Sequence, residues 1–253
     1  MKLAAAATAI LLAALLVTEP GQAHKGITSK FTYNGDVYPV FRDRCSRCHV
    51  TGGVGPMSLV TYEDAFPWAE SLRAELLAPA SEDPHDFVRA AHLQISAREL
   101  DVILDWASGG TPEGDKGQTP APIALRNDWA DGPPDLALQL PKPVEIAADT
   151  LEVTHEVVLP LSLPAVRSAS HFDVLPGNPA ILRSAVISMR SNGETRLLGT
   201  WFPRQQPLRL ALKPAARLEP GSEIVARLHY KKTWKFEGEA MIDQSTIGLY
   251  FAN

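Results

Sequence analysis

The sequence predicts an α + β protein of two domains, in which a small all-α domain precedes an antiparallel β-sandwich. Apolar residues recur at helical spacing before residue 110, and short runs rich in Val, Ile and Leu follow residue 122. The stretch between them is rich in Gly and Pro and has no apolar period, which is typical of a linker. The expected units are the helical domain over residues 24–110, the linker over 111–122 and the sandwich over 123–253.

Three helix starts are expected in the first half of the chain. They are capped by Asn34 or Asp36, by Thr61 with Asp64, and by Ser96 with Glu99. The last two pairs resemble capping boxes, in which a hydroxyl and a carboxylate three residues apart satisfy free backbone N–H groups. The first helix is expected to run into Cys45, and the last to end at Gly109.

Five runs in the second half are short and rich in Val, Ile and Leu, as strands are. They cover residues 151–160, 180–189, 208–212, 223–231 and 246–252. Turns that contain Pro and Gly separate them, for example at residues 176–179 and 219–221. Several short strands in about 130 residues indicate an antiparallel sandwich.

The first 23 residues have the pattern of a secretory signal peptide. Lys2 supplies a positive charge, residues 3–17 form an apolar run, and residues 21–23 are small enough for cleavage. An uncleaved membrane anchor is the alternative, but these 15 apolar residues fall short of the ~20 that a spanning helix needs. We expect an exported, periplasmic mature protein that begins at His24 and has no membrane span.

The charge is unevenly distributed. The whole chain has a formal net charge of −5, so nucleic acid and anionic lipid are poor candidates for partners. Residues 24–118 carry 9 basic and 14 acidic side chains, whereas residues 119–253 carry 14 of each. The acidic excess therefore belongs to the predicted helical domain.

Cys45-Ser46-Arg47-Cys48-His49 has the spacing of a c-type haem attachment motif. Two thiols one turn apart can add to the two vinyl groups of a haem, and the adjacent His49 can bind the iron as the proximal ligand. A thioredoxin-like dithiol does not explain the histidine, and a zinc site needs four ligands. No other cysteine exists, so no disulfide framework competes. We expect one covalent haem c.

The sixth iron ligand has three candidates, and the sequence leaves them open. Met57, His92 and His85 are favoured in that order. A thioether opposite the histidine raises the reduction potential and suits an electron carrier. Gly and Pro residues before Met57 form a turn that can bring its sulfur back towards the haem.

The residues around the motif resemble those of a known bacterial cytochrome c domain. The matching segments include Gly52-Gly53-Val54-Gly55-Pro56-Met57-Ser58-Leu59, Thr61-Tyr62-Glu63-Asp64-Ala65 and Trp106-Ala107-Ser108-Gly109-Gly110. That domain is often fused to a module similar to copper type II, ascorbate-dependent monooxygenases. Pro176-Gly177-Asn178-Pro179 and Asp243-Gln244-Ser245 continue the likeness in the second half. The resemblance implies a cytochrome c-like fold followed by a copper-monooxygenase-like sandwich.

Two departures from that family concern its copper ligands. A His-His pair follows the Pro-Gly-Asn segment in the family, whereas Arg183 lies in that neighbourhood here. The His-Tyr-His sequence of the family is His229-Tyr230-Lys231 in this chain. Copper of this class needs several imidazoles, and a cation cannot replace one. We therefore expect no copper.

The leading functional prediction is an exported monohaem c-type cytochrome that transfers single electrons to a redox protein partner, still unidentified. Its acidic helical domain would steer a basic partner, and its sandwich would serve docking or structure without catalysis. One alternative is a copper-dependent monooxygenase-like enzyme fed by the haem, with His155, His171 and His229 as candidate copper ligands. The other is a copper-binding protein that uses the mature N-terminal His24.

Overall fold

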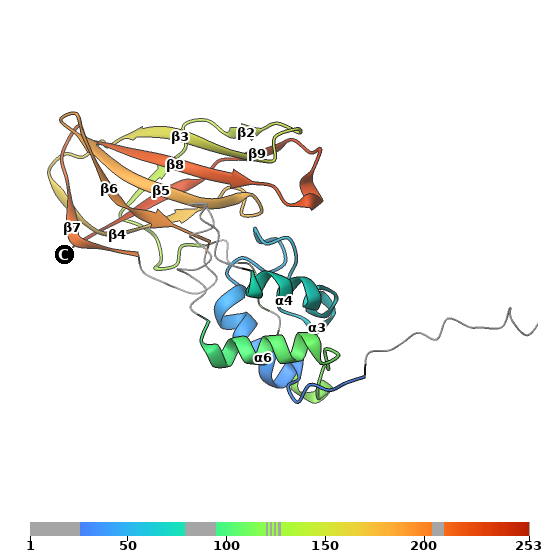
Figure 1. Cartoon of the computed structure of the whole chain (residues 1–253). Coiled ribbons are helices and arrows are strands. Elements are labelled where there is room, and N and C mark those ends of the chain that lie inside the picture. Colours follow the sequence, from blue (N-terminus) through green and yellow to red (C-terminus); the bar gives the residue numbers. More distant parts are fainter. Residues whose placement is uncertain are drawn as a thin grey trace, which may run out of the picture.

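Helices occupy the first half of the chain and antiparallel strands the second in the computed structural model (Figure 1). It describes residues 26–78, 95–119, 121, 123, 125, 128–203 and 210–252. The predicted signal peptide and the candidate ligands His24, His85 and His92 lie outside these residues. No helix within the described ranges combines the length and the apolar character needed to cross a membrane.

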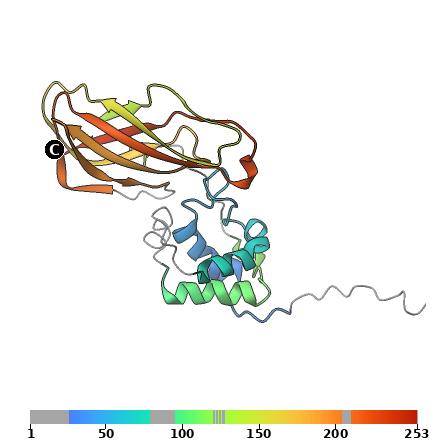
Figure 2. The same cartoon turned by 45° about the horizontal axis from the view of Figure 1, so that its top comes forward.

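The helices pack together beside the strands, as Figures 1 and 2 show from two directions. The α-helices are α2 (Tyr38–Val40), α3 (Tyr62–Ala65), α4 (Ala69–Leu77) and α6 (Ala97–Ser108). Two π-helical segments, Tyr33–Val37 and Phe41–Cys45, flank α2, so the chain is helical without a break from Tyr33 to Cys45. Short 3₁₀ segments are Phe66–Trp68, Lys116–Gln118 and Trp234–Phe236.

The helix caps confirm two of the three expected starts. The Thr61 hydroxyl accepts the Asp64 N–H before α3, and Ser96 forms a reciprocal capping box with Glu99 before α6. The prediction of Asn34 or Asp36 as the first cap is wrong. Thr32 is the N-cap, because its hydroxyl accepts the Gly35 N–H, while the Asp36 carboxylate accepts the backbone N–H of Thr32. Asn34 is buried within the helical segment.

Ten strands form three antiparallel sheets in the ranges that the structure describes. The strands are β1 (Leu136–Gln139), β2 (Val144–Ile146), β3 (Glu152–Pro160), β4 (Arg167–Leu175), β5 (Leu182–Ser191), β6 (Glu194–Trp201), β7 (Leu210–Leu218), β8 (Glu223–Lys231), β9 (Met241–Asp243) and β10 (Thr246–Phe251) in the described part of the chain. Two sheets have four strands, in the orders β1-β10-β4-β7 and β3-β8-β5-β6, and β2 pairs with β9.

The two four-stranded sheets share one hydrophobic core. Phe172 of β4 and Leu249 of β10 are fully buried in the same cluster as Ile187 of β5 and Leu228 of β8. The combination of helices and antiparallel sheets that the sequence predicts is therefore confirmed. The five expected strands all occur, although the run 180–189 begins as a strand only at Leu182. Residues 208 and 209 of the run 208–212 lie outside the described residues, and the strand continues from Leu210 to Leu218.

A separate cluster of aromatic side chains forms the core of the helical half. The Tyr33 ring lies 6.0 Å from that of Trp106 and 6.3 Å from that of Phe41, measured between ring centroids. Phe41 and Trp106 also meet edge to face at 6.2 Å. Because Phe41 begins the segment that ends at Cys45, this cluster fixes the direction in which the chain enters the cysteine motif.

Candidate functional site

The cysteine motif forms a single turn at the end of the first helical segment. The Cys45 carbonyl accepts hydrogen bonds from the backbone N–H groups of Cys48, at 3.1 Å, and His49, at 2.9 Å. Arg44, directly before the turn, pairs with Glu99 at 3.0 Å and so ties the motif to the start of α6. This geometry puts both thiols on one turn, as addition to two vinyl groups requires.

Both thiols are held in the neutral form. Burial, with a smaller contribution from Cys48, raises the pKa of Cys45 to about 12. Burial also raises the pKa of Cys48, against the nearby positive charges of Arg183 and Arg47. Neither cysteine forms a disulfide. The pair therefore remains available for covalent attachment.

The His49 ring is held by the backbone of Met57. Its Nδ1 lies 3.1 Å from the Met57 carbonyl oxygen. A carbonyl can only accept, so Nδ1 carries the proton in the neutral ring and Nε2 keeps its lone pair. Burial lowers the pKa of His49 more than this hydrogen bond raises it, which favours the neutral ring. An imidazole oriented through its outer nitrogen is what a metal-ligating histidine requires.

Two glycines allow the loop after the motif to close around His49. The Gly55 N–H donates to the Cys48 carbonyl at 2.8 Å. A Cβ on Gly55 would lie 2.8 Å from His49 Nδ1, and one on Gly53 would lie 2.6 Å from the Cys48 oxygen. Both contacts are shorter than real Cβ atoms make. The Gly-rich sequence predicts a turn here, but it does not show that the turn packs against the His49 ring.

Met57, the first candidate for the sixth ligand, lies beside His49. Its carbonyl contacts Nδ1, which points away from the nitrogen that would bind iron. The Met57 side chain packs against the helical core. Met57 thus orients the His49 ring through its backbone, and its own role as a sixth ligand stays a prediction. The other candidates, His92 and His85, lie outside the described residues.

The three histidines of the strand half have separate partners. The His155 ring meets the Tyr230 ring at 6.0 Å, and His229 Nε2 lies 2.9 Å from a Glu152 carboxylate oxygen. His171 stacks on Tyr250 at 4.2 Å in the other large sheet. In the part of the chain that the structure describes, no three His, Cys, Asp or Glu side chains gather in a group that could hold a metal ion.

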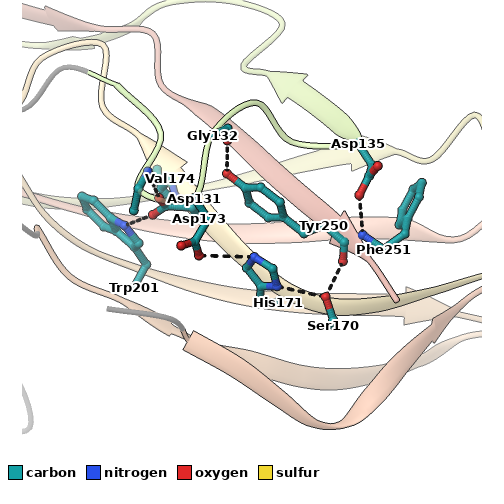
Figure 3. Close-up of polar contacts among 11 residues, drawn as sticks. Asp131, Gly132, Asp135, Ser170, His171, Asp173, Val174, Trp201, Tyr250 and Phe251 are labelled. Atoms are coloured by element: carbon teal, nitrogen blue, oxygen red, sulfur yellow. Dashed lines mark hydrogen bonds and ion pairs between the residues drawn. The ribbon is translucent and has the colours of Figure 1, made fainter. Parts of the chain in front are cut away.

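Figure 3 shows the polar network around His171. His171 Nε2 lies 3.4 Å from an Asp131 carboxylate oxygen, and its Nδ1 lies 2.9 Å from the Ser170 hydroxyl. The Tyr250 hydroxyl donates to the Gly132 carbonyl at 2.7 Å. These contacts fasten the loop before β1 to β4 and β10, which is a structural role.

The family-like segments of the strand half also serve the fold. The backbone N–H of Asn178 donates to the buried Asp243 carboxylate at 2.7 Å, and the Tyr230 hydroxyl donates to the same group at 2.8 Å. A Cβ on Gly177 would lie 2.6 Å from the backbone nitrogen of Gln244. The two segments, far apart in the sequence, therefore lock the turn before β5 against the end of β9.

The loop after the motif meets the strand half. A pocket at this junction is lined by Arg47, Gly53 and Val54 on one side and by Asp173, Pro179 and Trp201 on the other. The Asp173 carboxylate accepts hydrogen bonds from Trp201 Nε1 at 2.8 Å and from the Val174 N–H at 2.9 Å (Figure 3). Its oxygens are thus already used to build the pocket wall.

Arg183, which lies where the resembled family has copper-binding histidines, also influences the motif. Its charge influences both Cys48 and His49 across the junction. Contacts of this kind depend on how the two halves pack, and the local sequence carries no signal for them.

Comparison with known protein families and with curated proteins found no match for the chain.

Proposed function

We propose that this chain is an exported c-type cytochrome that holds one covalent haem and transfers single electrons. The observation that carries the proposal is the geometry of Cys45, Cys48 and His49, in which both thiols lie on one turn and the imidazole keeps its Nε2 lone pair. This donor set fits haem c. When bound, the haem supplies one iron that accepts and releases a single electron.

The residues of the chain have distinct parts in this proposal. Cys45 and Cys48 tether the cofactor, and His49 provides the proximal ligand. The Met57 carbonyl orients His49, and the Tyr33 hydroxyl holds the same loop by donating to the Leu59 carbonyl at 2.9 Å. Because the Met57 carbonyl already contacts Nδ1 of His49, we propose His92 as the first candidate for the sixth ligand, followed by His85.

We propose a domain type for each half of the chain. The helical half would be a cytochrome c-like domain, and the strand half a β-sandwich similar to the copper-monooxygenase-like module. We propose that the strand half is not catalytic and that the partner is a redox protein met outside the cytoplasm. The surroundings of His229 support a strand half without copper catalysis. Its Nε2 already pairs with Glu152 at 2.9 Å, and Lys231 pairs with the same carboxylate at 2.8 Å.

Expression of the whole chain in a host competent in haem attachment tests the proposal. The purified protein is expected to gain the mass of one haem and to keep its colour after acid–acetone extraction. Cys48→Ser should lose one thioether bond. Ser46→Ala is the matched control, since it alters the motif without removing a thiol or the histidine. Colourless wild-type protein with two free thiols would refute the proposal.

A metal count on the same sample tests the copper alternatives. We expect iron at one atom per chain and no stoichiometric copper. Copper retained by the mature wild-type chain but lost in His24→Ala would support the N-terminal site instead. Copper retained in that variant and lost in His229→Ala would support a copper site in the strand half.

A further inference from the structure

The loop before β1, residues 128–135, is tied to β4 and β10 by side chains of those strands (Figure 3). The Tyr250 hydroxyl of β10 donates to the Gly132 carbonyl at 2.7 Å. Beside this bond, a carboxylate oxygen of Asp131 lies 3.4 Å from Nε2 of His171 on β4. Nε2 is buried, so the protonation of the His171 ring decides how strongly the loop is held at Asp131.

A β-bulge brings the Ser170 hydroxyl to the other nitrogen of the same ring. The pairing of β4 with its neighbours shifts register between Ala169 and His171, so Ser170 is an extra residue in the strand. Successive side chains of a regular strand point to opposite faces, and a bulge changes the direction of one of them. The Ser170 hydroxyl lies 2.9 Å from Nδ1 of His171 and 3.2 Å from the Tyr250 carbonyl oxygen.

The protons of this network can be assigned from its donors and acceptors. Ser170 donates its hydroxyl proton to the Tyr250 carbonyl, which can only accept, so the same hydroxyl accepts from Nδ1 of His171. In a neutral ring, Nε2 would then present a lone pair to the Asp131 carboxylate, and two acceptors repel each other. Only the positively charged ring, with a proton on each nitrogen, satisfies all of these contacts together.

The stacking partner of His171 favours the same charged form. The ring of Tyr250 lies parallel to that of His171, with centroids 4.2 Å apart and an interplanar angle of 9°. The face of an aromatic ring attracts a cation. Tyr250 therefore supports the loop twice, through its hydroxyl and through the charge that it stabilises on the neighbouring imidazole.

The charged groups on the elements packed against His171 are mainly acidic. The loop 128–135 contains only acidic charges, and β4 adds Asp173, whose carboxylate accepts the Ala130 N–H at 3.2 Å. Arg167, at the start of β4, packs on an aromatic ring at the end of β10. On β7 the register places Ala211, which is not ionisable, opposite His171. These surroundings stabilise a positive charge on the imidazole.

The same loop forms part of the pocket at the junction of the two halves. Asp128 and Ala130 line this pocket together with Arg47 and Gly53, which belong to the cysteine motif and to the loop after it. A loop that loosens therefore alters one wall of the contact between the helical half and the strand half.

We propose that His171 is a pH-dependent latch, whose charged ring fastens residues 128–135 to β4 and β10 and whose neutral ring releases Asp131. A histidine changes its charge between about pH 5 and about pH 8. The latch is therefore closed in the acid part of this range and loosens as the pH rises. One wall of the pocket at the junction becomes pH-dependent with it. The inference goes beyond the proposed function and does not require a haem.

Hydrogen–deuterium exchange of the purified full chain tests the latch. Exchange is read by mass spectrometry for the peptide that covers residues 128–135, and each variant is compared with wild type at the same pH, so that the intrinsic rate cancels. At about pH 5, His171→Gln should speed exchange of this peptide roughly two- to fivefold, as the loss of a partly exposed ion pair would. At about pH 8 the difference should be much smaller. His155→Gln is the matched control, because His155 lies in the other large sheet, beside Tyr230.

Asp131→Asn removes the charge of the partner and leaves the ring in place. It should speed exchange at about pH 5, whereas at about pH 8 its amide N–H can donate to the neutral ring, so exchange should not rise. An equal effect of His171→Gln at both pH values would show a structural contact without titration and would overturn the latch. Exchange as slow as in wild type for Asp131→Asn at about pH 5 would also overturn it, even if His171→Gln does not fold.

Discussion

At His49, one backbone carbonyl decides which ring nitrogen is available to a metal. The Met57 oxygen can only accept, so the Nδ1 proton is fixed and Nε2 presents its lone pair. The loop can make this contact only because position 55 carries no Cβ. The motif contains the imidazole, and the glycine loop fixes its orientation.

Gly55→Ala should reduce haem loading. The added methyl group would come within 2.8 Å of both His49 Nδ1 and the Cys48 carbonyl, so the ring or the loop must move. Gly26→Ala is the control, because a Cβ there meets nothing within 4 Å. The measurement is the ratio of haem to protein after purification. Equal loading in the two variants would show that the cradle does not orient the ligand.

Met57→Leu should leave the optical spectrum of the oxidised protein unchanged. Leucine keeps the backbone carbonyl that contacts His49 and fills a similar volume in the helical core. If the wild-type protein shows the weak band at the red end of the spectrum that marks sulfur ligation and the variant loses it, Met57 is the sixth ligand after all. His92→Ala should instead change the spectrum.

Among the elements, α6 is the one whose start the sequence predicts best, because its capping box is local. Ser96 and Glu99 satisfy each other's backbone N–H groups, at 3.2 and 2.7 Å. Ser96→Ala should lower the free energy of unfolding by about 1 kcal/mol, measured by urea denaturation. Ser108→Ala, at the other end of the same helix, should have a smaller effect. A larger loss at Ser108 would contradict the capping argument.

Glu99 at the start of α6 should also make the free energy of unfolding depend on pH in the acid range. The Ser96 backbone N–H, the Ser96 hydroxyl and Arg44 hold the pKa of Glu99 below its ordinary value of 4.5. Its contribution is therefore complete above that pH and is lost as the pH falls through the lower folded-state value. Glu99→Gln should flatten the acid limb of the stability profile. An identical profile in wild type and variant would rule this contribution out.

The strands show where local sequence stops being informative. The prediction of residues 223–231 matches β8 because that strand is rich in buried apolar residues. Expected strands did not include β4, which begins with the polar run Arg167-Ser168, or β6, an edge strand with exposed residues at its start. Whether such segments form strands depends on hydrogen-bonded pairing with neighbouring strands, and a single sequence does not show that pairing.

At the scale of the whole molecule, the candidate site combines local and distant information. Cys45, Cys48 and His49 are adjacent in the sequence, so their spacing alone identified them. The lining of the pocket at the junction depends on the packing of the strand half against the motif, and the contact of the Met57 carbonyl with His49 depends on the closure of the loop. Neither could be deduced from residue spacing.

The two halves have separate hydrophobic cores, one built around Trp106 and one around Phe172 and Leu228. We therefore expect two thermal unfolding transitions in calorimetry, of which the helical one also appears in the far-ultraviolet helix signal. Under the proposed function, a haem attached through Cys45 and Cys48 would constrain only the helical half.

The double variant Cys45→Ser with Cys48→Ser should therefore lower the midpoint temperature of the helical transition. The midpoint temperature of the strand transition should stay the same, since each core depends on its own contacts. A single transition that shifts as a whole in this double variant would show that the junction near Arg183 couples the halves into one cooperative unit.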